Sequence, residues 1–430
     1  MRIIHIGQMT TETKKHRLEK LSTIYVLFIA YSLLAFLLIG YYKYPDSASY
    51  FNAWKDLMSG ELPGSRTPVY PVFLGLVQSV FSGKAVLWAV VILQTLVFAC
   101  SIHCFYRLAS SLVDSERWAF YLTLFYALFP GINSWNLALL TESLSVSMMV
   151  FMLYSAMRVV QDKSLRWVLV LVLWVLLLTF FRPSFLYVLP VVGVVALVMM
   201  RQKACRRLAA WALAGMVAVG ALLLSYCWLF NQQHGIFSPS RVGVVNQYFI
   251  ARQYGIMDPK AINDKDFREY MIQRQQESRE ATEEEIWEEI PVVFKTFSFH
   301  AISQGVNASN AMHRDLQVKA LLGRMQDAEK TFAFMAIEPM AYSVGLIGVN
   351  LGTIILFLLV YLCVVAYKWW KRREVNGWGV FLWMIISSNI FVSVVGAQSA
   401  WNRLNMPVMP ALLLLLGITW MVLRKNIKHG

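Results

Sequence analysis

The sequence predicts an all-α polytopic membrane protein with about ten transmembrane helices. An extracytoplasmic, mainly helical segment is expected between the seventh and the eighth of them. Three observations predict this fold class: the composition, the length of the apolar runs, and the distribution of Lys and Arg along the chain. Of the 430 residues, 58% are hydrophobic and only 15% are charged, whereas about 25% is usual for soluble domains.

The apolar runs are long enough to cross a bilayer as helices, which takes about 20 residues each. Runs such as Val168 to Phe181 and Ile354 to Tyr367 contain no charged side chain. They do not alternate in polarity, as the strands of a membrane β-barrel do. Spans are expected near residues 22–41, 85–106, 118–131, 140–157, 167–181, 185–200, 208–230, 344–367, 376–396 and 404–423.

The positive charges divide unequally between the two sides of these spans. With the N-terminus in the cytoplasm, the inside segments hold 21 of the 39 Lys and Arg residues and the short outside loops hold 6. Positive charge retained inside orients membrane proteins. The sequence therefore predicts a multi-pass protein of the cytoplasmic (inner) membrane with both termini cytoplasmic. The net charge of +14 is then a consequence of topology and predicts membrane lipids, not nucleic acid, as partners.

Residues 231–343 differ from the rest, because they hold 15 of the 25 acidic residues and 12 of the Lys and Arg residues. Within them, residues 264–290 are strongly charged and are expected to be helical. The chain is thus expected to comprise an N-terminal transmembrane module at 1–230, an extracytoplasmic segment at 231–343 and a C-terminal transmembrane module at 344–430.

Polar residues gather at the loops predicted to face outward. The first loop, residues 42–84, carries Asp46, then an amphipathic stretch with Tyr50 and Trp54 on one helical face, and then Arg66 before a proline-tyrosine stretch. The later outside loops add three charged residues, which are Glu142, Arg182 and Arg403. We expect the three arginines to converge on one cavity at the outer leaflet.

Two carboxylates and three arginines at one interface suit a substrate that carries phosphate and hydroxyl groups. Arginine stays charged and binds phosphate through two nitrogens. A carboxylate can take a proton from a hydroxyl, or stabilise a sugar whose anomeric carbon becomes cationic.

Each of these residues also has a simpler structural explanation, and the sequence leaves it open. Asp46 could cap the amphipathic helix, and Glu142 could interact with the dipole of the fourth span. The arginines could reach lipid phosphates, and the tyrosines could anchor the chain at the interface.

The same residues resemble the GT-C superfamily of membrane glycosyltransferases, most closely its protein O-mannosyltransferase-like and aminoarabinose-transferase-like bacterial branch. Asp46 followed by Tyr50 and Ala53 resembles the acidic signature of the first loop. The stretch from Arg66 to Leu74 resembles R-x-P-x-Y-P-x-x-L. Three further matches follow in order along the chain, at Thr141-Glu142, Arg182-Pro183 and the R-x-x-x-P of residues 403–407.

The resemblance implies a GT-C-like fold and an inverting glycosyltransferase at the outer face of the membrane. It would move a sugar from a polyprenyl-phosphate-linked donor to a lipid, glycan or protein acceptor. Asp46 would be the general base, and Glu142 would orient the acceptor or share a divalent cation, Mg²⁺ or Mn²⁺, with Asp46. The residues expected to bind substrate are Arg66, Tyr70, Arg182, Arg403 and Tyr50.

Two other functions remain open at this stage. A transporter or flippase of a lipid-linked saccharide would place its polar site near the bilayer midplane, often between two repeated halves. An oligosaccharide ligase would also need arginines facing a lipid pyrophosphate, and only the Asp46 signature separates it from the glycosyltransferase.

Overall fold

The computed structural model describes residues 11–113, 115–243, 245–246, 265–277, 351–372, 376–396 and 404–429. All elements named within these residues are helices, and the described part of the chain contains no β-strand. The all-α fold class predicted from the sequence is therefore confirmed.

Helices occupy the positions of the ten expected spans. They are α1 (Thr11–Leu38), α4 (Lys84–Leu112), α5 (Glu116–Leu128), α7 (Glu142–Asp162), α8 (Leu165–Phe181), α9 (Val188–Met199), α10 (Arg206–His234), α16 (Leu351–Arg372), α17 (Gly377–Gly396) and α19 (Met409–His429). Among the described helices, seven are long and apolar enough to cross a membrane, with α5, α8 and α9 falling short. The multi-pass architecture is confirmed, while the count of ten stays a prediction.

Short elements connect the long helices at the end of the molecule that carries the expected site. They are α2 (Ser47–Met58), α3 (Val69–Val80), α6 (Pro130–Asn133), η1 (Ser134–Leu137), η2 (Pro183–Phe185) and η4 (Met406–Val408). Local sequence explains their positions. For example, α8 ends at Phe181 because Pro183 favours extended backbone at the residue before it, and Arg182 has φ −151° and ψ 139°.

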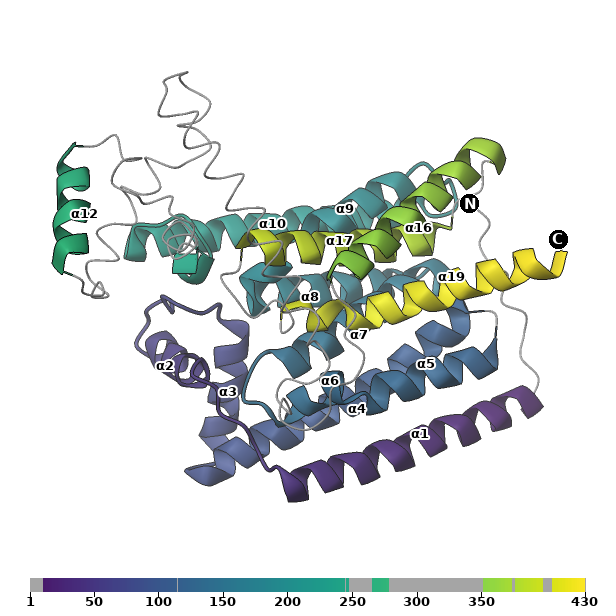
Figure 1. Ribbon diagram of the computed structural model, residues 1–430, viewed down its shortest axis with the longest axis horizontal. Coiled ribbons are helices and arrows are strands. Elements are labelled where there is room, and N and C mark those ends of the chain that lie inside the picture. The colour runs from purple at the N-terminus through teal and green to yellow at the C-terminus, as the bar shows by residue number, and fades with distance from the viewer. Residues whose placement is uncertain are drawn as a thin grey trace.

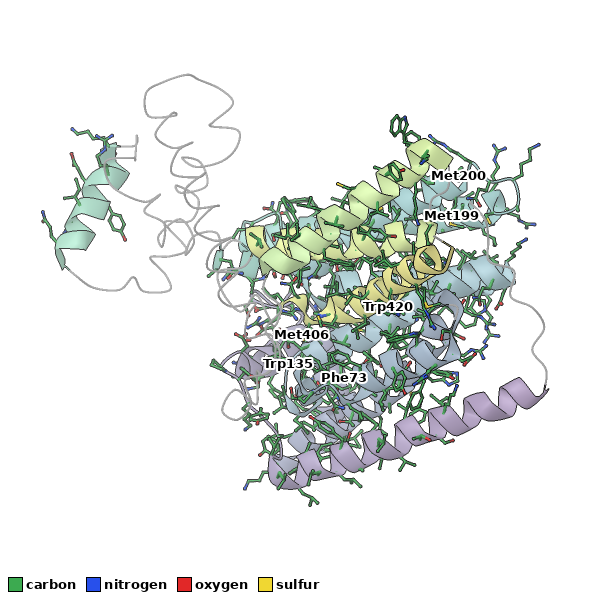
Figure 2. All side chains as sticks on the ribbon, turned by 45° about the vertical axis from the view of Figure 1, so that its right-hand side comes forward. Phe73, Trp135, Met199, Met200, Met406 and Trp420 are labelled. Carbon is green, nitrogen blue, oxygen red and sulfur yellow. The ribbon has the colours of Figure 1, made fainter. Side chains whose placement is uncertain are left out.

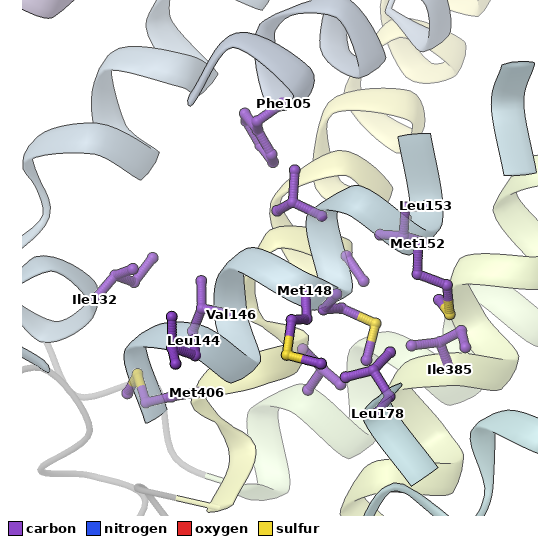
Figure 3. Packing of buried hydrophobic residues seen from close by; sticks show 14 of the residues in the cluster. Phe105, Ile132, Leu144, Val146, Met148, Met152, Leu153, Leu178, Ile385 and Met406 are labelled. Atoms are coloured by element: carbon purple, nitrogen blue, oxygen red, sulfur yellow. The ribbon is translucent and has the colours of Figure 1, made fainter. Parts of the chain in front are cut away.

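The long helices lie side by side, with α7 at the centre (Figure 1). α7 packs against α4 on one side and α8 on the other. In the most apolar part of α7, 72% of the residues are buried, whereas the figure for α10 is 22%, so α10 lies at the periphery of the bundle. Figure 3 shows Met148 and Met152 of α7 gathered with Leu178 of α8 and Ile385 of α17. The apolar core therefore surrounds α7 and fixes the position of its first residue, Glu142.

The two ends of the bundle differ in structure. α1 ends, and α4 begins, at the end of the bundle that carries α2 and α3, and α3 runs across the direction of the long helices (Figure 1). Figure 2 shows Trp135 and Met406 toward this end and Met199 and Met200 at the opposite end. The first residues of α1 and the last residues of α19 also lie at the opposite end, so the described ends of the chain share one side.

The predicted extracytoplasmic segment is described only in part. α12 (Lys265–Glu277) is a charged helix with Asp266 in its first turn, which confirms the expected helix over these residues. The rest of the predicted helix at 264–290 and most of 231–343 lie outside the described residues. The division of the chain at 230 and 344 stays a prediction.

Candidate functional site

The first of the loops predicted to lie outside is attached to the second by backbone hydrogen bonds. The Tyr42 N–H donates to the Leu137 carbonyl at 2.8 Å, and the Leu139 N–H donates to the Tyr42 carbonyl at 3.0 Å. The Ser47 hydroxyl adds a bond of 2.9 Å to the Leu139 carbonyl. Residues 132–147 are buried throughout, so the first loop rests on a rigid base and the start of α2 has a fixed position.

α2 packs on α3, and glycine makes the close approach possible. A Cβ atom added at Gly75 of α3 would lie 2.1 Å from the Trp54 ring of α2. Tyr50 and Ala53 of α2 are buried, while Met58 is 68% exposed. The helical face that carries Tyr50 and Trp54 therefore divides: its first turns pack on α3, and only its last turn is exposed.

Asp46 stands at the start of α2 and is bound to Arg66. One guanidinium nitrogen, Nη2 of Arg66, lies 2.9 Å from Oδ1 of Asp46. The Asp46 side chain makes no capping hydrogen bond to the N–H groups of α2, and the residue itself has helical dihedral angles. The capping role that the sequence left open for Asp46 is thus not supported. The Asp46 side chain is 35% exposed, which leaves it accessible to a second molecule.

Arg66 is positioned by two further residues of α2. Its Nε donates to the Ser49 hydroxyl at 2.8 Å, and its Nη1 lies 3.4 Å from the Tyr50 hydroxyl. The guanidinium carbon also lies 4.4 Å from the centre of the Tyr50 ring, which is a cation–π distance. The orientation of the guanidinium is therefore fixed by several contacts, as phosphate recognition by arginine requires.

Tyr70 lies behind this cluster and is fully buried. Its ring meets the Tyr50 ring edge-on at 4.9 Å, and its hydroxyl donates to Oε1 of Gln94 at 3.1 Å. Burial, with Tyr50 and Glu142 nearby, raises the pKa of Tyr70 well above its usual range, so the phenol stays protonated. A direct contact of Tyr70 with substrate, expected from the sequence, has no support in this arrangement: the hydroxyl is used internally, and Tyr70 supports Tyr50.

The second carboxylate, Glu142, is the first residue of α7 and is bound to Arg182. Nη1 of Arg182 lies 2.9 Å from Oε1 of Glu142, and the two side chains are 9% and 1% exposed. The pair is linked to the first loop, because the Thr67 hydroxyl donates to the Phe181 carbonyl at 2.8 Å. Thr67 follows Arg66 in the sequence, and Phe181 precedes Arg182. This hydrogen bond therefore joins the neighbours of two arginines that lie 116 positions apart.

Arg403 lies outside the described residues, so its expected convergence with Arg66 and Arg182 stays a prediction. The residues that follow it are described. Asn389 of α17 donates to Oδ1 of Asn405 at 2.8 Å and to the Leu404 carbonyl at 3.2 Å. η4 then packs against α7, and Figure 3 shows Met406 beside Leu144.

The divalent cation expected with Asp46 and Glu142 is not confirmed. Each of the two carboxylates is bound to an arginine. Across the described ranges, no three His, Cys, Asp or Glu side chains are grouped closely enough to hold a metal ion. This set of donors, two carboxylates that are each paired with an arginine, does not fit a divalent cation.

Two residues of the cluster, Ser49 and Gln94, were not expected from the sequence. Gln94 is fully buried in the apolar helix α4, where its amide also donates to the Ala138 carbonyl at 2.9 Å. A polar residue inside a membrane span is costly unless it has partners, so its presence there was a signal. Ser49 carries no comparable signal, because serine is common on exposed helix faces.

Comparisons with known proteins bear on the family and the fold of the chain. Residues 65–229 match the family described as dolichyl-phosphate-mannose-protein mannosyltransferase, from just before Arg66 into the C-terminal part of α10. No curated protein sequence matches the chain significantly.

A solved structure with a similar fold is the archaeal oligosaccharyltransferase AglB from Archaeoglobus fulgidus, in complex with an inhibitory peptide and a dolichol-phosphate. The TM-score is 0.51 at 11% identity, and the match covers 96% of this chain and 51% of that one. The chain thus spans about half the length of AglB. The chain therefore has a fold similar to that of AglB, and residues 65–229 match the dolichyl-phosphate-mannose-protein mannosyltransferase family, both in agreement with the GT-C resemblance noted in the sequence.

Proposed function

We propose that the protein is a glycosyltransferase that moves a sugar from a polyprenyl-phosphate-linked donor to a lipid, glycan or protein acceptor. The observation that carries this proposal is the contact between Arg66 and the accessible carboxylate of Asp46 at one end of a membrane-spanning bundle. The family match over 65–229 and the fold of AglB both support it. AglB itself is an oligosaccharyltransferase, whereas the matched family is named for mannose transfer to protein, so the sugar and the acceptor are left open.

The donor phosphate would bind to the arginines of the site. Arg66 is oriented by Ser49 and Tyr50, and it faces Asp46 with a single nitrogen atom. A phosphate entering beside this guanidinium would compete with Asp46 for that nitrogen, because arginine pairs with phosphate as readily as with carboxylate. Binding of the donor would thereby release Asp46 from its ion pair at the moment when a base is needed.

Asp46 would then act as general base on the acceptor hydroxyl. The carboxylate takes the hydroxyl proton while the acceptor oxygen forms a bond to the anomeric carbon. The bond between that carbon and the phosphate oxygen breaks, and polyprenyl phosphate leaves as an anion paired with arginine. A single displacement of this kind inverts the configuration of the sugar.

Glu142 and Arg182 would serve the same reaction from a more protected position. Their ion pair is almost fully buried, so water does not weaken it. We assign Arg182 a second contact to the phosphate or to the sugar, with Glu142 holding its orientation. Arg403 is the third proposed phosphate ligand, since the residues after it pack against α7, which begins at Glu142.

The proposed site has a different location from that expected of a transporter or flippase. A transporter binds its cargo near the midplane, on interrupted helices. Here both ion pairs lie where helices begin or end, at the start of α2, the start of α7 and the end of α8. The arrangement favours transfer at one interface over passage through the bilayer.

The orientation in the membrane is also part of the proposal. We infer that the site faces outward from the cytoplasmic membrane and that both termini are cytoplasmic, because positive charge is concentrated opposite the site. A cysteine placed at position 280 should react with a membrane-impermeant reagent in intact cells. If position 280 reacted only after the membrane was permeabilised, the opposite orientation would be indicated.

A transfer assay with purified protein tests the function itself. The protein would be incubated with a panel of radiolabelled polyprenyl-phosphate sugars and candidate acceptors, and the label would be followed into product. Arg66→Lys keeps the positive charge but not the fixed set of contacts, so we expect the KM for the active donor to rise about tenfold.

A matched control is Arg158→Lys, at the other end of α7. Arg158 is also bound to a carboxylate, that of Asp162, and lies 5.1 Å from the Trp167 ring. It should leave the KM unchanged. The proposal would be refuted if no donor transferred its label to any acceptor. It would also be refuted if Arg66→Lys and Arg158→Lys changed the KM equally.

A further inference from the structure

The turn that precedes Arg66 is attached to the C-terminal end of α10, where the predicted outside segment begins. The Leu62 N–H donates to Oε1 of Gln233 at 2.7 Å, and the Leu62 carbonyl lies 2.8 Å from Nε2 of His234. The Arg241 N–H donates to the Gly64 carbonyl at 2.8 Å. More than 170 positions separate the two sides of each contact, so this attachment is long-range. We refer to Gln233, His234 and Arg241 together as the turn clamp.

The clamp is closely packed as well as hydrogen-bonded. A Cβ atom added at Gly64 would lie 3.6 Å from Cδ of Arg241 and 3.7 Å from Cε1 of His234. On its other side, the His234 ring lies 4.4 Å from the ring of Phe230. The imidazole is thus held between α10 and the turn, two residues before Arg66.

The contacts of His234 fit one tautomer of the neutral imidazole. Nη2 of Arg241 lies 3.2 Å from Nδ1 of His234. A guanidinium can only donate, so Nδ1 must accept, and the single ring proton of the neutral imidazole sits on Nε2 and points to the Leu62 carbonyl. A second proton on Nδ1 would face the guanidinium, placing donor against donor and cation against cation.

We propose that His234 and Arg241 are positioning residues for Arg66, and that the clamp holds the first loop only while His234 is neutral. This rests on the proposed function, in which Arg66 binds the donor phosphate. Arg241 brings a charged side chain into contact with His234. The turn presents a backbone carbonyl to the imidazole, and α10 presents the ring of Phe230. Protonation of His234 would therefore release the turn and loosen the loop that carries Arg66.

Amide hydrogen exchange of the full-length protein in detergent tests the clamp without any substrate. The N–H groups of Leu62 and Arg241 are both donors within it, so peptides containing them report its opening. In the wild type we expect their protection to fall as the pH is lowered. His234→Phe keeps a ring against Phe230 but removes both polar contacts, and it should lower protection roughly tenfold at all pH values.

Two further variants complete the test. His234→Gln cannot gain a proton, and its amide can both donate and accept, so protection should be retained and should no longer depend on pH. His103→Phe makes the same exchange of side chains within α4, away from the turn, and should leave the protection of these peptides as in the wild type. Wild-type protection of Leu62 and Arg241 that does not change with pH, or that survives in His234→Phe, would overturn the proposal.

The pH profile of sugar transfer then separates positioning from mere stability. The KM for the donor should rise at low pH in the wild type, whereas in His234→Gln it should stay level. A KM that rises equally in both would refute the link to Arg66. If no sugar transfer is found with any donor, the proposed function fails while the exchange data still decide whether the clamp exists.

Discussion

Two arginine–carboxylate pairs lie at the same end of the bundle with the same separation of 2.9 Å, yet their surroundings differ. The pair of Arg66 and Asp46 forms within one loop, and its side chains are 15% and 35% exposed. The pair of Arg182 and Glu142 joins the end of α8 to the start of α7, and its side chains are 9% and 1% exposed.

The difference indicates that the two carboxylates have different roles. An accessible ion pair contributes less than about 1 kcal/mol and can exchange its partner easily. A buried pair cannot lose a partner without leaving an uncompensated charge in a site of low polarity, which costs about 3–5 kcal/mol. Asp46 is therefore suited to take part in a reaction, whereas Glu142 is suited to hold Arg182 in place.

The largest effect is expected from Asp46→Asn. As a general base, Asp46 should contribute about 10²- to 10⁴-fold to the rate of transfer. Asparagine keeps the size of the side chain, and the carboxylate makes no capping bond to α2, so the protein should unfold at nearly the wild-type temperature. Transfer rates and thermal unfolding in detergent measure the two effects.

An Asp46→Asn protein that folds and transfers sugar at the wild-type rate would reverse the comparison. The base would then have to be sought at Glu142, and the accessible pair would be only a surface contact. Ser49→Ala is a useful companion, because it removes one contact of Arg66 without touching the carboxylate.

The buried pair should respond in the opposite way, through stability first. Arg182→Met leaves Glu142 buried without its arginine, and we expect a loss of about 3–5 kcal/mol in the free energy of unfolding. The double substitution Arg182→Met with Glu142→Leu removes both charges and should recover most of this loss. Transfer should remain impaired in both proteins, since the proposed contact of Arg182 is absent from each. Equal stability of the single and double variants would show that the pair is not buried as the structure has it.

A smaller effect is expected where the first loop packs on α3. Gly75→Ala would place a methyl group at 2.1 Å from the Trp54 ring, so the ring and α2 must move. Overpacking of this kind costs about 1–3 kcal/mol. Asp46 directly precedes α2 and Ser49 lies within it. A shift of α2 should therefore lower activity together with stability. Gly220→Ala is the matched control, since its nearest neighbour, Leu189 of α9, would lie at 3.7 Å. A tolerated Gly75→Ala would indicate that α2 is not seated closely on α3.

The residues of the accessible pair stand out in the sequence more clearly than the contact within the buried pair, for a physical reason. Asp46 and Arg66 are 20 positions apart, in a loop whose polar residues stand out between apolar spans. The positions of the helices were also predictable, because a helix that crosses lipid requires a long apolar run in the sequence. These features depend on local composition, which the sequence displays directly.

The partners of the buried residues depend on packing between distant helices. The bond between Arg182 and Glu142 requires the end of α8 to meet the start of α7, and no local pattern specifies that contact. The same holds for Tyr70, whose motif resembles a substrate-binding stretch but whose hydroxyl meets Gln94 of α4. Residue type and loop position indicated the site, whereas the pairing within it followed only from the structure.

Tyr70→Phe should give the smallest effect and separates the two interpretations of that residue. If Tyr70 bound substrate directly, losing its hydroxyl would weaken donor binding at unchanged stability. In the structure the hydroxyl serves Gln94, while the ring supports Tyr50 at 4.9 Å and Phe181 at 5.7 Å. Phenylalanine keeps the ring, so we expect a loss of about 1 kcal/mol in stability and nearly unchanged transfer. Gln94→Leu should lower stability in the same direction, because it removes the other partner. The opposite result would be donor binding that weakens about tenfold or more in Tyr70→Phe, with an unchanged unfolding temperature. It would show that the Tyr70 hydroxyl contacts the substrate directly and that the site extends beneath Tyr50.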